Sequence, residues 1–189
     1  MRIRADLTDE IVDGLRGIRG QFKVPAELPA AVVQAADDAA KRAPTSHTDR
    51  TEWPFVTLDP ATSTDLDQAF HIETTGNDVL LHYAIADVAW FVDDGGVLDQ
   101  EAWQRGETQY LPDGKAGLYP AALAEGAASL LPDGPRPAIV FHVRVDTEGA
   151  SKLDGVERSL IRSRAKLAYE TVQPAQLPRF ASTRWGTRE

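Results

Sequence analysis

The chain has 189 residues, of which 42% are hydrophobic and 26% are charged, a composition typical of one soluble globular domain. It contains no cysteine, which excludes disulfides, zinc–thiolate sites and cysteine nucleophiles and fits a reducing cytoplasm. No apolar run approaches the roughly 20 residues that a membrane span requires, and the first residues lack the apolar core of a signal peptide. We therefore expect a cytoplasmic protein that makes no membrane contact.

The net charge of −9 is unevenly distributed along the chain. Residues 1–50 balance eight positive charges against eight negative ones, whereas residues 51–135 carry two positive and fifteen negative charges. Residues 136–189 carry ten positive and six negative charges, so only the last third of the chain offers a basic surface. Such a surface suits nucleic-acid phosphates, although a solvated charged face explains it equally well.

Two helices are expected near the N-terminus. Asp6 or Thr8 is a suitable cap for the first, which starts at Asp9, has acidic residues in its first turn and carries an apolar stripe at helical spacing. The second covers residues 30–43 and is rich in alanine, the best helix former. Residues 44–50 are polar and predict a linker.

Three carboxylates, those of Asp59, Asp65 and Asp67, fall within a short window that contains no cation. An apolar run before them predicts a buried strand, which Pro60 ends by removing a backbone donor. Because Asp65 and Asp67 flank Leu66, an extended backbone directs both carboxylates to one side. Carboxylates gathered in this way repel one another unless a cation lies among them, and Mg²⁺, or Mn²⁺ in its place, prefers such ligands.

Turn chemistry is the commoner explanation of an isolated Asp-x-Asp pair, since Asp side chains bond nearby backbone N–H groups. Two named cation or phosphate sites are excluded by the pattern. A calcium loop of the EF-hand type requires a further acidic residue and a glycine where Ala69 and Phe70 stand, and an Asp-x-Asp-x-Thr phosphatase requires threonine at Ala69.

Strands alternate with one short helix in the rest of the chain. Residues 69–73 and 79–88 predict a hairpin around a Thr-Gly-Asn turn, residues 98–107 a short helix, and residues 138–145 and 155–162 two further strands. The expected fold class is α+β, with a helical prefix followed by a mainly antiparallel sheet with short helices.

Several single residues invite a functional interpretation. His82 alternates with apolar neighbours, which favours a histidine on a strand face over a metal ligand. Asp87 ends an apolar run, and we favour a structural hydrogen-bonding role there over a further metal ligand. The aromatic residues Trp90, Trp103 and Tyr119 are expected to be buried or half-buried.

The basic residues of the last third recur at two-residue spacing with one gap, and they are Arg158, Arg162, Arg164 and Lys166. On an extended chain this spacing places them on one face, which predicts an edge that contacts RNA phosphates. An exposed edge strand kept soluble by charge is the alternative.

The acidic stretch and four later segments together resemble the RNB catalytic domain of the ribonuclease II / ribonuclease R family. The matching segments are Thr57–Phe70, Ala84–Val88, Thr108–Pro112, Ala127–Pro132 with Arg136, and Ile161–Glu170. The resemblance covers residues 53–173, and each segment is weak evidence on its own. Gln68 stands at the fourth acidic position of the family motif.

The resemblance implies a hydrolytic 3′-to-5′ exoribonuclease that uses Mg²⁺ to release nucleoside 5′-monophosphates from single-stranded RNA. It makes Asp59, Asp65 and Asp67 metal ligands, of which Asp65 and Asp67 are also the candidate catalytic residues. Gln68 would be a fourth, uncharged ligand that weakens metal binding, and Tyr110 would stack on the base at the RNA 3′ end.

The expected organisation is a helical prefix and linker over residues 1–50, the N-terminal part of an RNB-type domain over 51–173, and an irregular tail over 174–189. Because RNB domains continue well beyond the matched part, we expect an incomplete version of the domain, with a second chain as the candidate partner that completes it. The alternatives are a non-catalytic RNA-binding remnant and a degenerate fragment with neither property.

Overall fold

The computed structural model describes residues 9–25 and 27–172. The helices are α1 (Asp9–Gln21), α2 (Ala30–Ala39) and α3 (Val97–Arg105), with a 3₁₀ turn η1 (Val88–Trp90) and a π-helical turn η2 (Leu123–Ala127). The strands are β1 (Thr48–Asp49), β2 (Phe55–Asp59), β3 (Gln68–Thr75), β4 (Asp78–Ala86), β5 (Gln109–Leu111), β6 (Gly114–Ala116), β7 (Arg136–Val145), β8 (Ser151–Ile161) and β9 (Ser163–Ala168). Within these ranges, no helix has both the length and the apolar character needed to cross a membrane.

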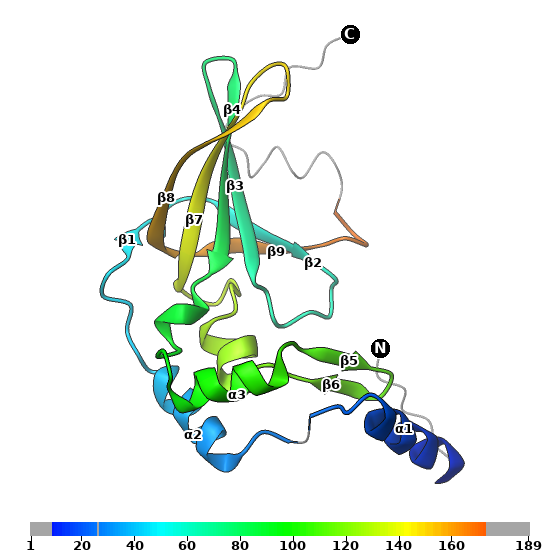
Figure 1. Cartoon of the computed structure of the whole chain (residues 1–189). Coiled ribbons are helices and arrows are strands. Elements are labelled where there is room, and N and C mark those ends of the chain that lie inside the picture. The colour runs from blue at the N-terminus through cyan, green and yellow to red at the C-terminus, as the bar shows by residue number, and fades with distance from the viewer. Residues whose placement is uncertain (1–8, 26, 173–189) are drawn as a thin grey trace.

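Seven of the strands form one sheet in the order β1-β8-β7-β4-β3-β2-β9 (Figure 1). The central pairs are antiparallel, while β1 pairs with β8 and β2 pairs with β9 in parallel. The two ends of this order are joined by short pieces of chain, because only residues 50–54 separate β1 from β2 and only Arg162 separates β8 from β9. The sheet is therefore strongly curled, and its two ends are held close together by these short connections.

The main hydrophobic core lies on the inner face of the curled sheet. Its buried members are Phe55, Leu66, Ala69, Ala84, Leu130, Ala138, Val140 and Ile161. Ala69, Ala84 and Val140 are direct partners across β3, β4 and β7. Small side chains at these central positions leave room for the tight curl, as in small barrels.

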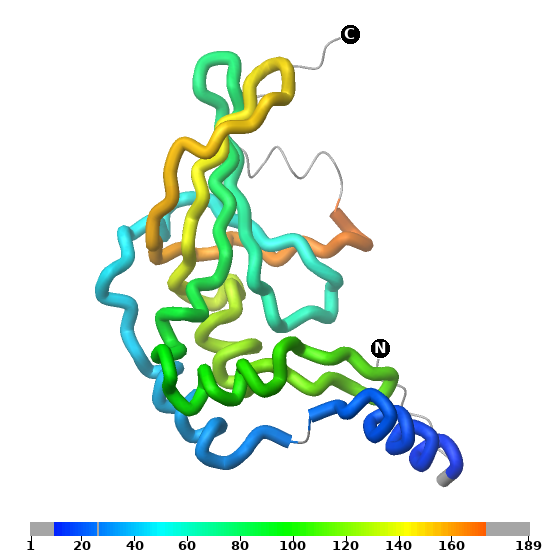
Figure 2. Tube along the Cα trace, in the orientation of Figure 1, coloured from blue at the N-terminus to red at the C-terminus, as the bar shows by residue number. Residues whose placement is uncertain are grey.

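A helical layer lies below the sheet in Figures 1 and 2 and has its own core. That core joins α2, α3 and η2 through Val32, Ala36, Ala39, Phe91, Leu98, Leu123 and Ala128. The short hairpin of β5 and β6 lies beside this layer, and α1 is tied to the hairpin turn by the ion pair of Arg19 with Asp113, at 2.9 Å. The β5–β6 hairpin thus lies next to the β2–β3 loop, where Tyr110 and Lys115 contact Asp65.

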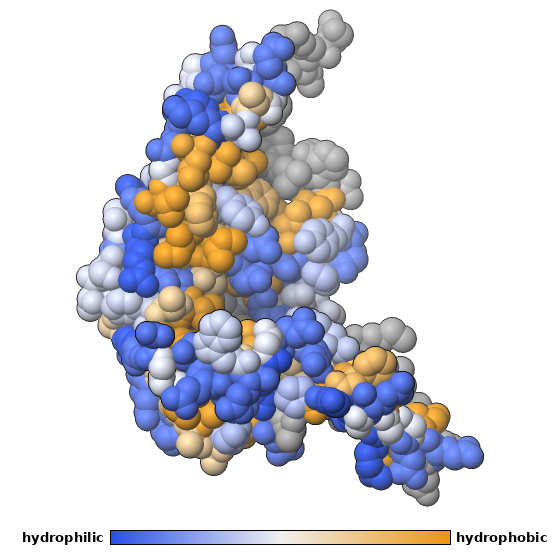
Figure 3. Space-filling model, viewed as in Figure 1, coloured by the Kyte–Doolittle hydropathy of each residue, from blue (hydrophilic) through white to orange (hydrophobic). Residues whose placement is uncertain are grey.

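The surface differs between the two layers. Figure 3 shows apolar side chains gathered on the visible face of the sheet, whereas the helical layer is mostly hydrophilic in this view. Leu153 and Val156 on β8 are about half exposed, at 54% and 50%. The outer face of the sheet is therefore less polar than the rest of the visible surface.

The expected α+β class is confirmed, with helices before a mostly antiparallel sheet. The predicted β3–β4 hairpin is present and turns at Gly76, whose φ of +65° lies in the left-handed region that glycine adopts without strain. The second helix is shorter than predicted and ends at Ala39. The predicted caps Asp6 and Thr8, and the tail over 174–189, lie outside the described residues.

Two local predictions were wrong. The segment predicted as a polar linker contains β1, and His47 within it is buried, with a side chain only 1% exposed. Trp103 was expected to be buried but is 82% exposed on α3. Residue type alone misled here, because α3 buries Leu98 and Arg105 and leaves the side of the helix that bears Trp103 in water.

Candidate active site

The loop between β2 and β3 carries the acidic residues, and a serine from a distant segment fixes its shape. Ser129 Oγ accepts a hydrogen bond from the Leu66 backbone N–H at 2.9 Å and donates one to the Thr64 carbonyl at 2.7 Å. The Leu130 N–H donates to the Leu66 carbonyl at 2.7 Å. Leu66 is fully buried in the core, so Asp65 and Asp67 on either side are directed toward the surface.

The three predicted aspartates lie close enough for their charges to interact. Burial raises the pKa of Asp59, and the carboxylates of Asp67 and Asp65 raise it further. Asp65 is half-buried and Asp67 is exposed. In the described part of the chain, however, the group whose three ligand atoms all lie within 4.8 Å is another one, His71 with Glu73 and His82. The aspartates therefore gather without converging on one point.

A lysine from β6 lies against this acidic loop. Lys115 Nζ is 3.0 Å from Asp65 Oδ2 and 3.0 Å from Glu125 Oε1 on η2. Burial pushes the pKa of Asp65 upward, but hydrogen bonding and charge from Lys115 hold it below its ordinary value. Burial disfavours the charged amine, yet Glu125 and Asp65 together raise the pKa of Lys115. Lys115 therefore stays protonated. It supplies the positive charge that residues 57–70, which carry the three aspartates, do not contain.

Glu125 joins the site through the π-helical turn η2. Thr64 Oγ1 donates a hydrogen bond to Glu125 Oε2 at 2.8 Å. Lys115 and Thr64 both lower the pKa of Glu125, which is ionised at neutral pH. Sequence reasoning missed Lys115 and Glu125 because they come from segments about 50 and 60 residues after Asp65, with no local pattern that marks them.

A second lysine organises the start of the loop. Lys166 on β9 donates hydrogen bonds from Nζ to the carbonyl of Ala61, at 2.9 Å, and to that of Ser63. Its charge lowers the pKa of Asp59, although burial and the neighbouring carboxylates outweigh this effect. Lys166 thus contacts the loop backbone, whereas the sequence predicted that it contacts RNA phosphates.

Gln68 and Tyr110 lie at the edges of the acidic loop. Gln68 is exposed, and its Oε1 accepts a hydrogen bond from the Tyr83 hydroxyl. Tyr110 on β5 is 74% exposed, and its hydroxyl donates to Asp65 Oδ2 at 3.2 Å. The hydroxyl anchors the ring beside Asp65 while most of the ring surface stays in solvent.

The four basic residues predicted to share one face of one strand do not do so. The strand ends at Ile161, the chain bends at Arg162, and β9 continues beside β2 at the other end of the sheet order. Arg158 pairs with Asp87 at 2.8 Å, and Arg164 donates to the Thr51 carbonyl at 2.7 Å. A role in RNA contact stays a prediction for each of these four residues, but together they do not form one basic edge.

Asp87 takes the structural role that its position favoured. Its side chain is 2% exposed, with Oδ2 at 3.0 Å from His47 Nε2 and at 2.8 Å from Arg158 Nε. Its backbone N–H donates to the Pro137 carbonyl at 3.0 Å. The residue links the end of β4 to the segment before β1 and to β8.

The fold and the loop can be compared with known proteins. The structure matches Mycoplasma genitalium RNase R in complex with ribose methylated single-stranded RNA with a TM-score of 0.80 and 27% identity, over 90% of this chain and 27% of that one. Exoribonuclease 2 of Pectobacterium atrosepticum is 39% identical over 126 residues, which are 66% of this chain and 20% of the relative. Yeast Ssd1, described as a pseudonuclease, shares the fold with a TM-score of 0.58 at 18% identity, over 77% of this chain and 17% of that one.

The curled sheet with its acidic loop is therefore similar in architecture to one part of Mycoplasma genitalium RNase R. The family model of the RNB domain matches residues 47–177, and the chain belongs to the RNB domain family. The matched residues span about a fifth of the length of curated relatives such as this exoribonuclease.

Proposed function

We propose that this chain provides the metal-dependent site of a 3′-to-5′ exoribonuclease that acts on single-stranded RNA. The observation that carries the proposal is the cluster formed by Asp59, Asp65 and Asp67 beside the exposed ring of Tyr110. A cluster of carboxylates suits a hard divalent ion, and an exposed aromatic ring grips a base without reading its identity. The similarity to exoribonucleases supports this assignment.

The donor set fits Mg²⁺, or Mn²⁺ in its place. Asp59, Asp65 and Asp67 would hold the ion, and the Gln68 amide oxygen would add an uncharged ligand. When bound, the ion would activate a water and neutralise charge on the scissile phosphate. We propose that one ion binds more weakly here than it would with a fourth carboxylate.

The chain's own residues orient this cluster. Tyr110 and Lys115 both bond Asp65 Oδ2, which fixes that carboxylate and places an ammonium group beside the position proposed for the phosphate. Within the described residues, no lysine or tyrosine bonds the Asp67 carboxylate, so this carboxylate is available to the ion. Burial and the neighbouring carboxylates raise the pKa of Asp59, and a bound cation would offset this repulsion.

Metal removal tests the proposal directly. With Mg²⁺ present, the chain is expected to shorten a 5′-labelled single-stranded RNA from its 3′ end and to release nucleoside 5′-monophosphates. Excess EDTA should stop this release, and added Mn²⁺ should restore it. Release that continues in EDTA, or products that begin at the 5′ end, would overturn the assignment.

Tyr110→Ala is expected to weaken binding of a single-stranded RNA by about 5- to 150-fold, since base stacking contributes about 1–3 kcal/mol per base. Tyr110→Phe keeps the ring and should bind almost as well as the wild type. Trp103→Ala is the matched control, because this exposed aromatic residue lies on α3 and should leave binding unchanged. Fluorescence anisotropy with a labelled oligonucleotide measures all three, and equal affinities for Tyr110→Ala and Trp103→Ala would contradict the role.

A non-catalytic RNA-binding protein is the second candidate. Lys115 favours it, because its ammonium group neutralises Asp65 and Glu125 without any metal ion. Gln68 also lowers the negative charge of the site relative to the family motif. This candidate predicts salt-sensitive RNA binding without hydrolysis. The expectation that a second chain completes the site stays a prediction.

A further inference from the structure

Three histidines form a row across the inner face of the sheet. His71 on β3 pairs directly with His82 on β4, which pairs directly with His142 on β7. His71 and His82 are 5% and 3% exposed. Trp53 packs against the row, with its ring centroid 4.4 Å from that of His82. The row lies next to the alanine-rich centre of the core, so these imidazoles are held by packing on both sides.

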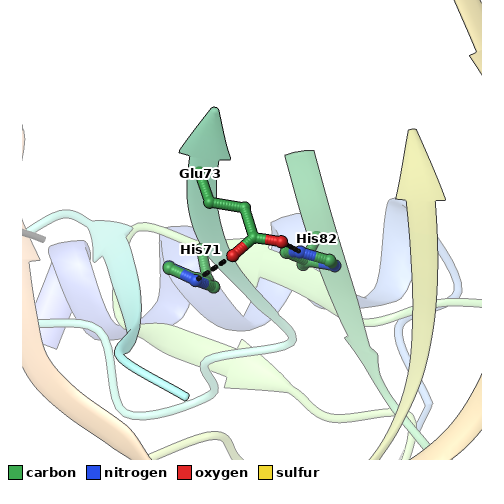
Figure 4. A group of neighbouring side chains, drawn as sticks. All are labelled: His71, Glu73 and His82. Carbon is green, nitrogen blue, oxygen red and sulfur yellow. Dashed lines mark hydrogen bonds and ion pairs between the residues drawn. The ribbon is translucent and has the colours of Figure 1, made fainter. Parts of the chain in front are cut away.

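A carboxylate completes a compact group at this row. Glu73 Oε1 is 3.1 Å from His82 Nε2, and Glu73 Oε2 is 3.9 Å from His71 Nε2. Figure 4 shows the carboxylate between the two imidazole rings. The ligand atoms of the three residues all lie within 4.8 Å of one another. The Glu73 side chain is 41% exposed, so the group opens to solvent at its carboxylate.

We propose that His71, Glu73 and His82 form a binding site for a late first-row divalent metal ion, with Zn²⁺ as the probe. Two imidazoles and one carboxylate are a ligand set that Zn²⁺ accepts, with metal–ligand bonds of about 2.0–2.2 Å. Tetrahedral bonds of that length separate neighbouring ligand atoms by about 3.3 Å. The Glu73 Oε1–His82 Nε2 distance of 3.1 Å is already close to that separation, whereas the Glu73 Oε2–His71 Nε2 distance of 3.9 Å would have to shorten, and water would take the fourth position.

The residues behind His82 are arranged as the hydrogen-bond partners that a metal-binding histidine needs. His82 Nδ1 is 2.7 Å from His142 Nδ1, and His142 Nε2 is 3.7 Å from Glu157 Oε1. Glu157 is in turn held by Arg50, with Nε to Oε1 at 2.7 Å. When His82 Nε2 binds the ion, its Nδ1–H can donate to His142, whose Nε2–H then points to Glu157. Metal-binding histidines commonly donate their second N–H in this way, which fixes the ring and its tautomer.

The proposed site is separate from the acidic loop. His71 follows Gln68 by three residues on β3, which corresponds to about 10 Å along a strand, and Glu73 lies farther along the same strand. The ligand chemistry differs too, because imidazole nitrogen suits Zn²⁺ and related ions whereas Mg²⁺ prefers oxygen. An ion at the histidines would brace β3 against β4 and would raise thermal stability by binding only the folded chain.

Zinc binding to the full 189-residue chain tests the site. Competition with a chromogenic chelator should give one Zn²⁺ per chain that millimolar Mg²⁺ does not displace, and thermal unfolding should shift to higher temperature. Glu73→Gln is the decisive variant, because this half-exposed side chain tolerates the change. It should lower zinc affinity at least about tenfold. His142→Gln should lower the affinity by about 10- to 100-fold while leaving the three ligands in place.

Two controls separate this site from other zinc binding. Glu148→Gln, at an exposed position in the turn between β7 and β8, should bind zinc as the wild type does. Asp65→Asn should also bind normally, because it alters only the acidic loop. The proposal is overturned if the chain binds no Zn²⁺ or if Glu73→Gln binds it with wild-type affinity. Loss of zinc binding in Asp65→Asn alone would place the ion in the acidic loop and would equally overturn it.

Discussion

Replacing Asp67 with asparagine is expected to reduce Mg²⁺-dependent release of mononucleotides by on the order of 10²–10³-fold, because a metal ion stabilises the transition state by several kcal/mol. Asp67 is the sharpest test among the three aspartates. Its side chain is exposed, whereas its backbone carbonyl accepts a hydrogen bond from the Ala86 N–H at 2.9 Å. Asparagine keeps that backbone contact and the side-chain shape and removes only the charge. Asp65→Asn would also break the ion pair with Lys115.

The comparison needs two measurements on each variant. Release of monophosphates reports the chemistry, and anisotropy with a labelled single-stranded RNA reports binding. RNA binding by Asp67→Asn should equal or slightly exceed that of the wild type, because a negative charge has been removed near the phosphates. Asp94→Asn makes the same chemical change at an exposed position before α3 and should retain full release. If Asp67→Asn released monophosphates at the rate of Asp94→Asn, the nuclease assignment would fail.

Asp87→Ala is expected to lower the free energy of unfolding by about 3–5 kcal/mol, which is the usual cost of removing one partner from a buried ion pair. The substitution leaves His47 buried without its partner and removes the anchor of Arg158. Because Arg158 is 42% exposed and stays partly hydrated, we expect a value toward the lower end. Chemical denaturation followed by circular dichroism measures the change.

Asp93→Ala provides the matched control for that experiment. Asp93 also pairs with an arginine, Arg42, at 2.9 Å, but its side chain is 73% exposed. A surface ion pair of this kind contributes at most about 1 kcal/mol. If the two substitutions lowered the free energy of unfolding equally, burial would not explain the contribution of Asp87 to stability. The Asp87–Arg158 pair also affects how RNA binding is tested. Substitution of Arg158 would break this pair and disturb the fold, whereas Arg162 is exposed at the bend after β8 and can be substituted without that effect.

The sequence predicted the parts of the site that are local. The strand before Asp59, the stop at Pro60 and the opposed directions of Leu66 and its acidic neighbours follow from short-range patterns, and the structure agrees with them. The hairpin of β3 and β4 follows from its turn residues in the same way. Such features need only periodicity and turn chemistry, which a single segment contains.

The parts that the sequence did not predict depend on contacts between distant segments. Lys115 and Glu125 reach Asp65 only because the β5–β6 hairpin and η2 pack beside the loop. The histidine row depends on the register of three strands, so His82 alone gave no sign of His71 or His142 as neighbours. The regular spacing after Arg158 was misleading, because the bend at Arg162 sends the chain to another part of the sheet.

The pairing at the two ends of the sheet constrains the order of folding. The parallel pairs at the two ends of the strand order join Thr48 to Ser159 and Asp59 to Ala168, which are about 110 residues apart in each case. Contacts between residues so distant in sequence form slowly, whereas the β3–β4 hairpin needs only neighbouring residues. During synthesis, β1 and the outer edge of β2 must therefore wait for almost all of the described chain before they find their parallel partners. Until then the edge of β2 is an unpaired template that a chaperone, or another nascent chain, can reach first.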